Sequence, residues 1–286
     1  MAEFITALGK FEFLRNALIV GILASLSCGI VGSYVVTRRI SYVAGGISHF
    51  VLGGMGMARY LSVVYRWEFM TPLFGAVISA LFAAVVIGLV SLKAKQREDT
   101  VIGALWAIGM AVGILFIAKT PGYNQDLMSY LFGNILMVSS EDIYLILILD
   151  IVVIAIAMLF YNQLLAVCFD EEFARLRGVN VEFYYLLLLC LTALTVVLLV
   201  TVVGIVMVIA LLTLPSAVAG YFSKNLRQMM VLSIILCAVF NTLGLAISYA
   251  PNLPSGATII VLAGATYLAV TVGSRVVKKK KAGAPK

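Results

Sequence analysis

The chain contains a single histidine, His49, which lies in the middle of a long apolar segment, YVAGGISHFVLGGMGMA. An ionisable side chain at that depth in a membrane helix normally faces the bundle interior or a water-filled path. Gly45 and Gly53 stand four residues before and after His49, so the three share one helix face and leave the imidazole bordered by bare backbone. Such a groove can admit a hydrated ion. It can equally admit a neighbouring helix, because small residues four apart are a common packing device in membranes, and both readings stay open.

A second ionisable residue, Asp150, lies near the centre of another apolar segment, LILILDIVVIAIA. A carboxylate at the centre of a membrane helix costs roughly 2.5–3.5 kcal/mol on insertion scales, so it needs a partner or a proton. One interpretation is an ion or proton ligand that faces the interior. The other, slightly favoured, is a protonated acid hydrogen-bonded to a Ser, Thr or backbone carbonyl of an adjacent helix.

The composition shows which elements position these two residues. Of the 286 residues, 63% are apolar and only 12% are Asp, Glu, Lys or Arg, whereas soluble domains carry roughly 25% charged residues. The apolar runs predict a single polytopic transmembrane domain over 1–286, an all-α bundle of about nine spans. The predicted spans are 16–37, 41–58, 71–92, 101–118, 142–160, 183–201, 203–221, 229–249 and 257–274. The run 183–221 is either two spans with a tight turn near Gly204 or one over-long tilted helix that would leave eight spans, and two spans fit the bilayer better. The apolar stretch 127–138 is too short to cross and predicts an interfacial or re-entrant helix.

The net charge of +7 is best explained by loop topology. With nine spans, fifteen of the twenty basic residues fall in one set of loops, and the positive-inside rule places that set in the cytoplasm. The N-terminus is therefore expected outside and the C-terminus inside. The basic tail, 275–286, predicts contact with anionic membrane lipid, and we expect no nucleic-acid partner.

One of the predicted cytoplasmic loops follows the segment ALLTLPSAVAGYFSKNLRQMM. Pro215 is expected to interrupt the span near the cytoplasm and to let a short surface helix follow. This predicts a docking element over 215–228 for a cytoplasmic partner, or merely a kinked helix end. Its candidate residues are Pro215, Ser216, Ala219, Lys224 and Arg227. The sequence has no GxxxxGK[ST] phosphate loop, no HExxH and no GxSxG motif, so the chain is predicted not to be an enzyme.

Five segments, TRRISYVAGGISHFVLGG, EDTVIGALWAIG, DLMSYLFGNIL, ALLTLPSAVAGYF and LPSGATIIVLAG, occur in the order and spacing of the permeases of zinc, manganese and iron ABC importers. The chain resembles that family over nearly its whole length. The resemblance implies a fold similar to type II ABC importer permeases. It also implies a second permease subunit, identical or related, an extracytoplasmic metal-binding protein, and two cytoplasmic ATP-binding subunits. Segment 215–228 would be the coupling element that docks on the ATPase, with Pro215 and Ala219 at the family's Pro and Ala.

The chain departs from the family pattern at three positions. Family members commonly have Asp where this chain has Gly45 and Asn252, and zinc-type members tend to have His where it has Ala107. One imidazole plus an amide binds a divalent ion weakly. This subunit would then be the less liganded half of a heterodimer, or Asp150 would replace the missing carboxylate, or the cargo would be a metal chelate.

The resulting prediction is a permease subunit in a bacterial or archaeal cytoplasmic membrane that moves zinc, manganese or iron by alternating access. The metal would pass beside His49, Asp150 and Asn252 as cargo, and no resident cofactor is expected. The binding protein would dock on loops 59–70, 119–141 and 250–256. The alternatives are a metal-chelate permease and a self-contained secondary transporter or channel, which would need no nucleotide-binding partner.

Overall fold

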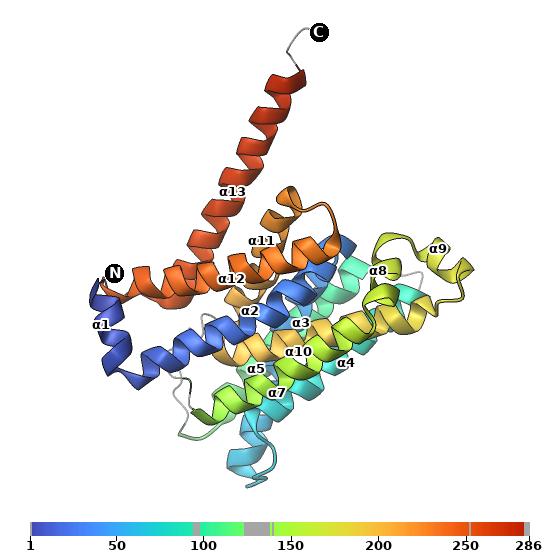
Figure 1. Cartoon of the computed structure of the whole chain (residues 1–286). Coiled ribbons are helices and arrows are strands. Elements are labelled where there is room, and N and C mark those ends of the chain that lie inside the picture. The colour runs from blue at the N-terminus through green and yellow to red at the C-terminus, as the bar shows by residue number, and fades with distance from the viewer. Residues whose placement is uncertain (1, 94–97, 123–137, 139, 252, 283–286) are drawn as a thin grey trace.

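The structure is a computed structural model that describes the chain except for residues 1, 94–97, 123–137, 139, 252 and 283–286. The described residues form a helical bundle from which the last helix projects (Figure 1). The helices are α1 (Ala2–Lys10), α2 (Glu12–Arg38), α3 (Ser41–Val64), α4 (Pro72–Lys93), α5 (Glu98–Lys119), α7 (Ser140–Leu159), α8 (Tyr161–Phe169), α9 (Glu171–Leu176), α10 (Val181–Val203), α11 (Ile205–Phe222), α12 (Leu226–Tyr249) and α13 (Ser255–Ala282).

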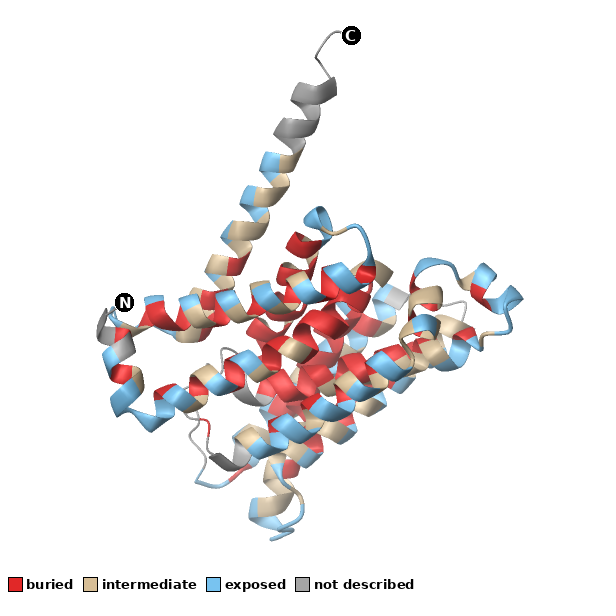
Figure 2. Cartoon of the chain, in the orientation of Figure 1, coloured by how far each residue is buried: buried red, intermediate tan, exposed pale blue. Residues whose placement is uncertain are grey.

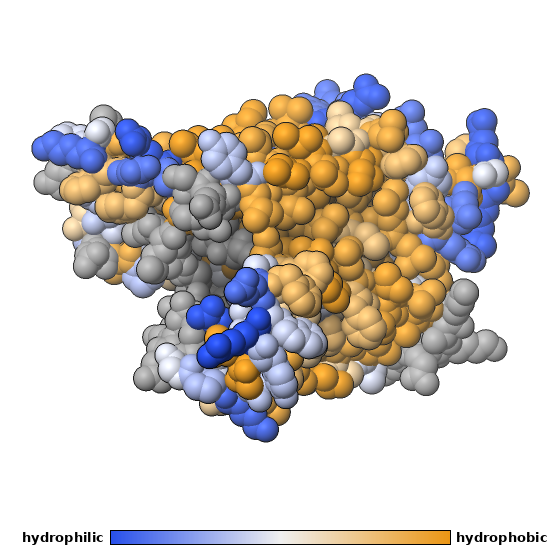
Figure 3. Space-filling view, turned by 90° about the horizontal axis from the view of Figure 1, so that it is seen from below, coloured by the Kyte–Doolittle hydropathy of each residue, from blue (hydrophilic) through white to orange (hydrophobic). Residues whose placement is uncertain are grey.

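Nine of the described helices have 18 or more residues, and each overlaps one of the nine predicted spans. Seven are apolar enough to cross a membrane on their own, and α7 with α8 makes an eighth candidate that is bent by 70°. The remaining long helix is α3, whose glycines, His49 and Arg59 lower its hydropathy. Apolar side chains also cover a broad area of the surface, with hydrophilic residues towards its edges (Figure 3). The chain is thus a multi-pass membrane protein, and a count of nine is consistent with its helices.

Local sequence signals explain several helix ends. Gly204 separates α10 from α11 with a φ of 79°, a left-handed backbone that favours glycine, so the long apolar run 183–221 is two helices. Asp170 caps α9 by accepting a hydrogen bond from the Phe173 N–H. Asn225 caps α12 in the same way through the N–H of Gln228.

The core is built around α2, and buried residues gather in the middle of the bundle and are sparse along α13 (Figure 2). A Cβ on Gly32 would stand 2.1 Å from the carbonyl oxygen of Leu212 in α11, so only glycine permits this approach. Asn241 of α12 links to the other half of α2 by donating hydrogen bonds to the Gly21 carbonyl at 2.9 Å and to Ser25 Oγ at 3.1 Å.

Residues of five helices make contacts at one end of the bundle. Arg38, at the end of α2, forms an ion pair with Glu171 of α9 and lies 5.5 Å from the ring centroid of Tyr185 in α10. Arg227, in the first turn of α12, lies 4.9 Å from the ring centroid of Tyr161 at the start of α8. The end of α2 thus contacts α9 and α10, and the start of α12 contacts α8.

Pro215 lies inside α11, which continues unbroken to Phe222, and α12 begins only four residues later, so the expected interruption and separate surface helix are wrong. Proline removes one backbone hydrogen bond, and helices packed on both sides hold the remainder of the helix in place. The stretch 127–138 lies, apart from Val138, outside the described residues.

Candidate functional site

His49 lies halfway along α3 and is buried, with only 8% of its surface exposed. Its imidazole stacks on the indole of Trp106 in α5, with ring centroids 4.0 Å apart and planes 14° from parallel. Within the described residues, its Nδ1 atom is buried without a hydrogen-bond partner. A buried polar atom left unpaired costs about 1–3 kcal/mol and calls for an explanation in function.

The two glycines predicted to flank His49 have different neighbours. A Cβ on Gly53 would stand 2.9 Å from the carbonyl oxygen of Gly109, so this glycine permits close packing of α3 on α5. A Cβ on Gly45 would lie 3.6 Å from Trp106 Cζ3 and 3.5 Å from Ile209 Cδ1, which is ordinary contact with side chains. Gly53 thus faces a helix backbone, and Gly45 faces the Trp106 indole.

Asp150 is buried in α7, and its carboxylate accepts a hydrogen bond from the hydroxyl of Ser27 in α2. The structure therefore places Asp150 at the interface of α7 with α2, whereas His49 lies at the interface of α3 with α5. The two are not brought together. The arrangement matches the interpretation in which a serine of an adjacent helix satisfies the acid, and it gives no support to Asp150 as a replacement ligand beside His49.

Asn252, the third predicted pathway residue, lies outside the described residues. Its neighbour Leu253 donates its backbone N–H to the carbonyl oxygen of Ser248, which fixes the turn between α12 and α13. Across the described part of the chain, no three His, Cys, Asp or Glu side chains are grouped so that they could hold a metal ion. Among the described residues, His49 is therefore not part of such a group.

The predicted coupling residues fall into a buried and an exposed group. Pro215, Ser216 and Ala219 are buried in α11. Lys224 and Arg227 are exposed around the α11–α12 turn. The turn is held by a reciprocal cap, in which the Lys224 N–H donates to Gln228 Oε1 at 3.0 Å and the Gln228 N–H donates to Asn225 Oδ1 at 2.8 Å. A compact, rigid basic turn therefore projects from this end of the bundle.

The sequence profile of the ABC 3 transport family matches residues 10–274. The chain belongs to this family. A "probable metal transport system membrane protein" of Chlamydia trachomatis is 40% identical over 85% of this chain and 83% of that protein. The manganese transport system membrane protein MntC of Listeria monocytogenes is 36% identical over 91% of this chain and 90% of that protein.

A solved structure, PsaBC from Streptococcus pneumoniae in complex with Fab, shares the fold of this ABC 3 family member. It superposes with a TM-score of 0.83 at 33% identity and covers 94% of each chain. These similarities confirm the resemblance to the permeases of metal ABC importers and the all-α polytopic fold.

Sequence reasoning missed one residue of the site in this ABC 3 family member, Trp106. The family pattern singles out the next residue, Ala107, as the position where zinc-type family members tend to have His. Ala107 is exposed, and it is Trp106 that contacts His49. A signal was present, because tryptophan in membrane helices concentrates at the interfaces and Trp106 stands well inside its span. An interior tryptophan indicates a specific contact.

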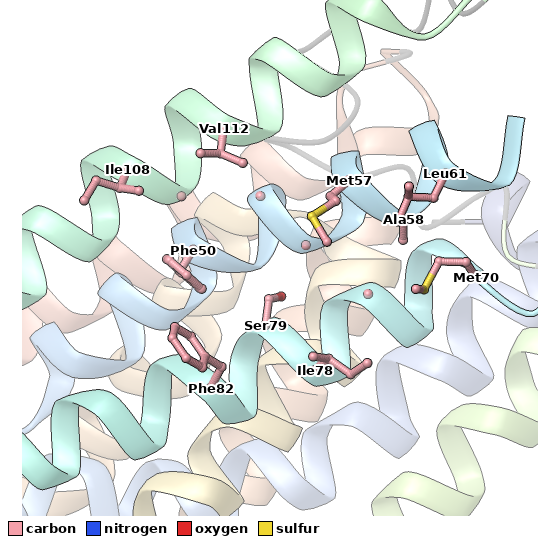
Figure 4. Close-up of a pocket in the computed structure, with 14 residues that line it drawn as sticks. Phe50, Met57, Ala58, Leu61, Met70, Ile78, Ser79, Phe82, Ile108 and Val112 are labelled. Atoms are coloured by element: carbon pink, nitrogen blue, oxygen red, sulfur yellow. The ribbon is translucent and has the colours of Figure 1, made fainter. Parts of the chain in front are cut away.

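A pocket of about 360 Å³ opens between α3, α4 and α5, beside the site but without His49 in its wall (Figure 4). Phe50 and Phe82 stand at one end and Leu61 and Met70 at the other. Among its lining residues Ser79 carries a hydroxyl, and that hydroxyl donates to the Ala76 carbonyl at 3.1 Å. The pocket is thus a hydrocarbon-lined space in this ABC 3 family member, and an ion would gain little there.

Proposed function

We propose that this chain is the permease subunit of an ABC importer that moves a divalent transition-metal ion, manganese, zinc or iron, by alternating access. The family match over residues 10–274 carries the proposal. The name of the Listeria monocytogenes relative makes manganese the first metal to test. The ion is cargo, and no resident cofactor is proposed.

His49 supports this function through its chemistry. A neutral imidazole nitrogen is a preferred ligand for zinc and iron, whereas manganese favours oxygen ligands and would need them beside the imidazole. The buried Nδ1 has no partner among the described residues. A single nitrogen holds a divalent ion only weakly, since such ions take four to six ligands. Weak holding suits a conduit, because the ion must leave as readily as it enters. A second permease subunit across the pathway would supply further metal ligands. It would be either an identical chain or a related chain that has more metal-ligand side chains.

The partners follow from what the chain itself lacks and from its charge. No phosphate-binding loop is present in the sequence, so ATP hydrolysis belongs to a separate pair of cytoplasmic subunits. The basic end of the bundle, with Arg38, Lys224 and Arg227, is assigned to the cytoplasm by the positive-inside rule. The capped turn around Lys224 is the proposed contact with the ATPase. The loops at the other end, 59–70, 119–141 and 250–256, are the proposed dock for an extracytoplasmic metal-binding protein.

The test is metal uptake by the assembled importer in proteoliposomes with ATP on the ATPase side. We expect wild-type transport of radiolabelled manganese, zinc or iron, and about tenfold less of the same metal with His49→Ala, because one ligand is lost. Ser248→Ala is the control, since among the described residues the hydroxyl of this buried serine donates within its own helix, at 3.0 Å to the Leu245 carbonyl oxygen. Undiminished uptake of all three metals by His49→Ala would remove His49 from the pathway.

A further inference from the structure

The imidazole of His49 is covered on one face by the Trp106 indole. A centroid separation of 4.0 Å at 14° is a close parallel stack, and most aromatic pairs are offset or edge-on at 4.5–7 Å. The indole also fills the space over Gly45, since a Cβ there would touch Trp106 Cζ3 at 3.6 Å. A longer side chain at position 45 would occupy the same space as the indole.

The covered face is where the ligands of a bound ion would have to lie. A metal ion on Nδ1 stands in the plane of the imidazole, about 2.1 Å from the nitrogen. Its other ligands then project above and below that plane. The parallel indole occupies the region above it. With Trp106 in the stacked position, that face of the imidazole is closed to the ligands of an ion, and Nδ1 itself is buried.

The indole of Trp106 is partly exposed, and the surface beside it is open. Trp106 is 37% exposed, whereas His49 beneath it is 8% exposed. A helical side chain lies over the turn that precedes its own Cα, which here is the turn of Gly103. Apart from the backbone of its own helix and its two chain neighbours, no described atom lies within 4 Å of the position that a Cβ would take on Gly103. The surface beside that turn is therefore open in this chain, and an indole turned off the imidazole would lie over it.

We propose that Trp106 is a movable cover of the metal pathway: stacked on His49 it keeps a divalent metal ion off Nδ1, and turned over Gly103 it opens that site. The inference rests on the proposed function and assigns the gating of His49 to a side chain of the same subunit. A cover that is closed most of the time lowers the apparent affinity of the site by the fraction of molecules that are open. Removal of the cover should therefore tighten metal binding.

The experiment measures manganese binding to the purified full-length chain in lipid nanodiscs, from the loss of the electron paramagnetic resonance signal of free Mn²⁺. We expect Trp106→Ala to lower the Kd for Mn²⁺ at least about fivefold, and Trp106→Phe to have a Kd between those of the wild type and Trp106→Ala. The double variant Trp106→Ala/His49→Ala should lose saturable Mn²⁺ binding. An unchanged or raised Kd in Trp106→Ala, or binding that survives the loss of His49, would overturn the proposal.

A second measurement keeps the native indole in place. The chain has two tryptophans, so Trp67→Phe leaves Trp106 as the sole indole emitter. Saturating Zn²⁺ should shift its emission maximum as the indole leaves the stack, and His49→Ala should abolish the shift. Bound metal with no shift would contradict a moving cover.

Uptake by the wild-type importer, measured in parallel, separates the two proposals. ATP-driven metal uptake without His49-dependent binding would refute the proposed role of Trp106 and leave the permease function intact. Absence of any metal uptake would refute both the role of Trp106 and the permease function.

Discussion

Two buried polar residues, His49 and Asp150, look equivalent in the sequence, because each interrupts an apolar span. Their neighbours distinguish them. Asp150 accepts a hydrogen bond from Ser27, whereas His49 has an aromatic partner and a polar atom left unpaired. The depth of each residue was readable from the sequence, but the identity of its neighbours was not, since it depends on which helices pack together and at what rotation.

We expect the carboxyl of Asp150 to stabilise the fold through its hydrogen bond with Ser27. Ser27→Ala leaves a buried acceptor unsatisfied and should destabilise the chain by about 1–3 kcal/mol, seen as a lower midpoint of thermal unfolding in detergent. Ser248→Ala, whose hydroxyl bonds within its own helix, should change the midpoint much less.

The role of Asp150 in transport is tested by Asp150→Asn, which keeps an oxygen acceptor for Ser27 but cannot ionise. We expect metal uptake by the assembled importer to be retained within about twofold, because this carboxyl is not at the metal. A loss of uptake comparable to that of His49→Ala, with unchanged thermal stability, would make Asp150 a ligand.

At the scale of the elements, α3 is less apolar than its packing partners α4 and α5, because it carries glycines on its packing faces together with His49 and Arg59. Hydrophobic length predicted where each span lies, including the break at Gly204. It did not predict α1, the bend between α7 and α8, or the continuation of α11 through Pro215, since these depend on packing in three dimensions.

The close contact of α3 with α4 gives a prediction. A Cβ on Gly54 would stand 2.3 Å from the carbonyl oxygen of Gly75, so Gly54→Ala forces the two backbones apart. We expect a loss of about 1–3 kcal/mol in stability, measured by thermal unfolding. Gly264→Ala is the control, because among the described residues no atom lies within 4 Å of its would-be Cβ. Equal midpoints for the two variants would refute the packing role.

The α11–α12 turn makes a prediction about coupling. Lys224→Glu reverses the charge of an exposed residue while the reciprocal cap, which uses only its backbone N–H, stays intact. In the assembled importer we expect ATP hydrolysis stimulated by the binding protein to fall several-fold, with Lys224→Arg close to wild type. Wild-type stimulation in Lys224→Glu would remove this residue from the proposed contact.

At the scale of the whole molecule, the end of α2 contacts α9 and α10, and the start of α12 contacts α8, at one end of the bundle. Charge bias alone predicted that the basic loops near these helix ends share a side of the membrane. The long helix α13 leaves much of its apolar surface exposed, including Val261 and Leu268. Lipid or a second permease subunit has to cover that surface.

The proposed orientation is open to direct test. In a chain whose native cysteines are replaced by Ala, we expect Glu68→Cys to react with a membrane-impermeant maleimide on intact cells. Lys224→Cys should react only after the membrane is opened. The reverse pattern would invert the topology and with it the assignment of the coupling turn.

The central claim is that this chain is an unpowered conduit driven by a separate ATPase, and uphill accumulation of metal measures it most directly. Proteoliposomes with the full importer and ATP should concentrate manganese, zinc or iron above the outside level. Vesicles with this chain alone should only equilibrate the metal or exclude it. Accumulation by the chain alone, driven by an ion gradient, would contradict the account and make it a secondary transporter.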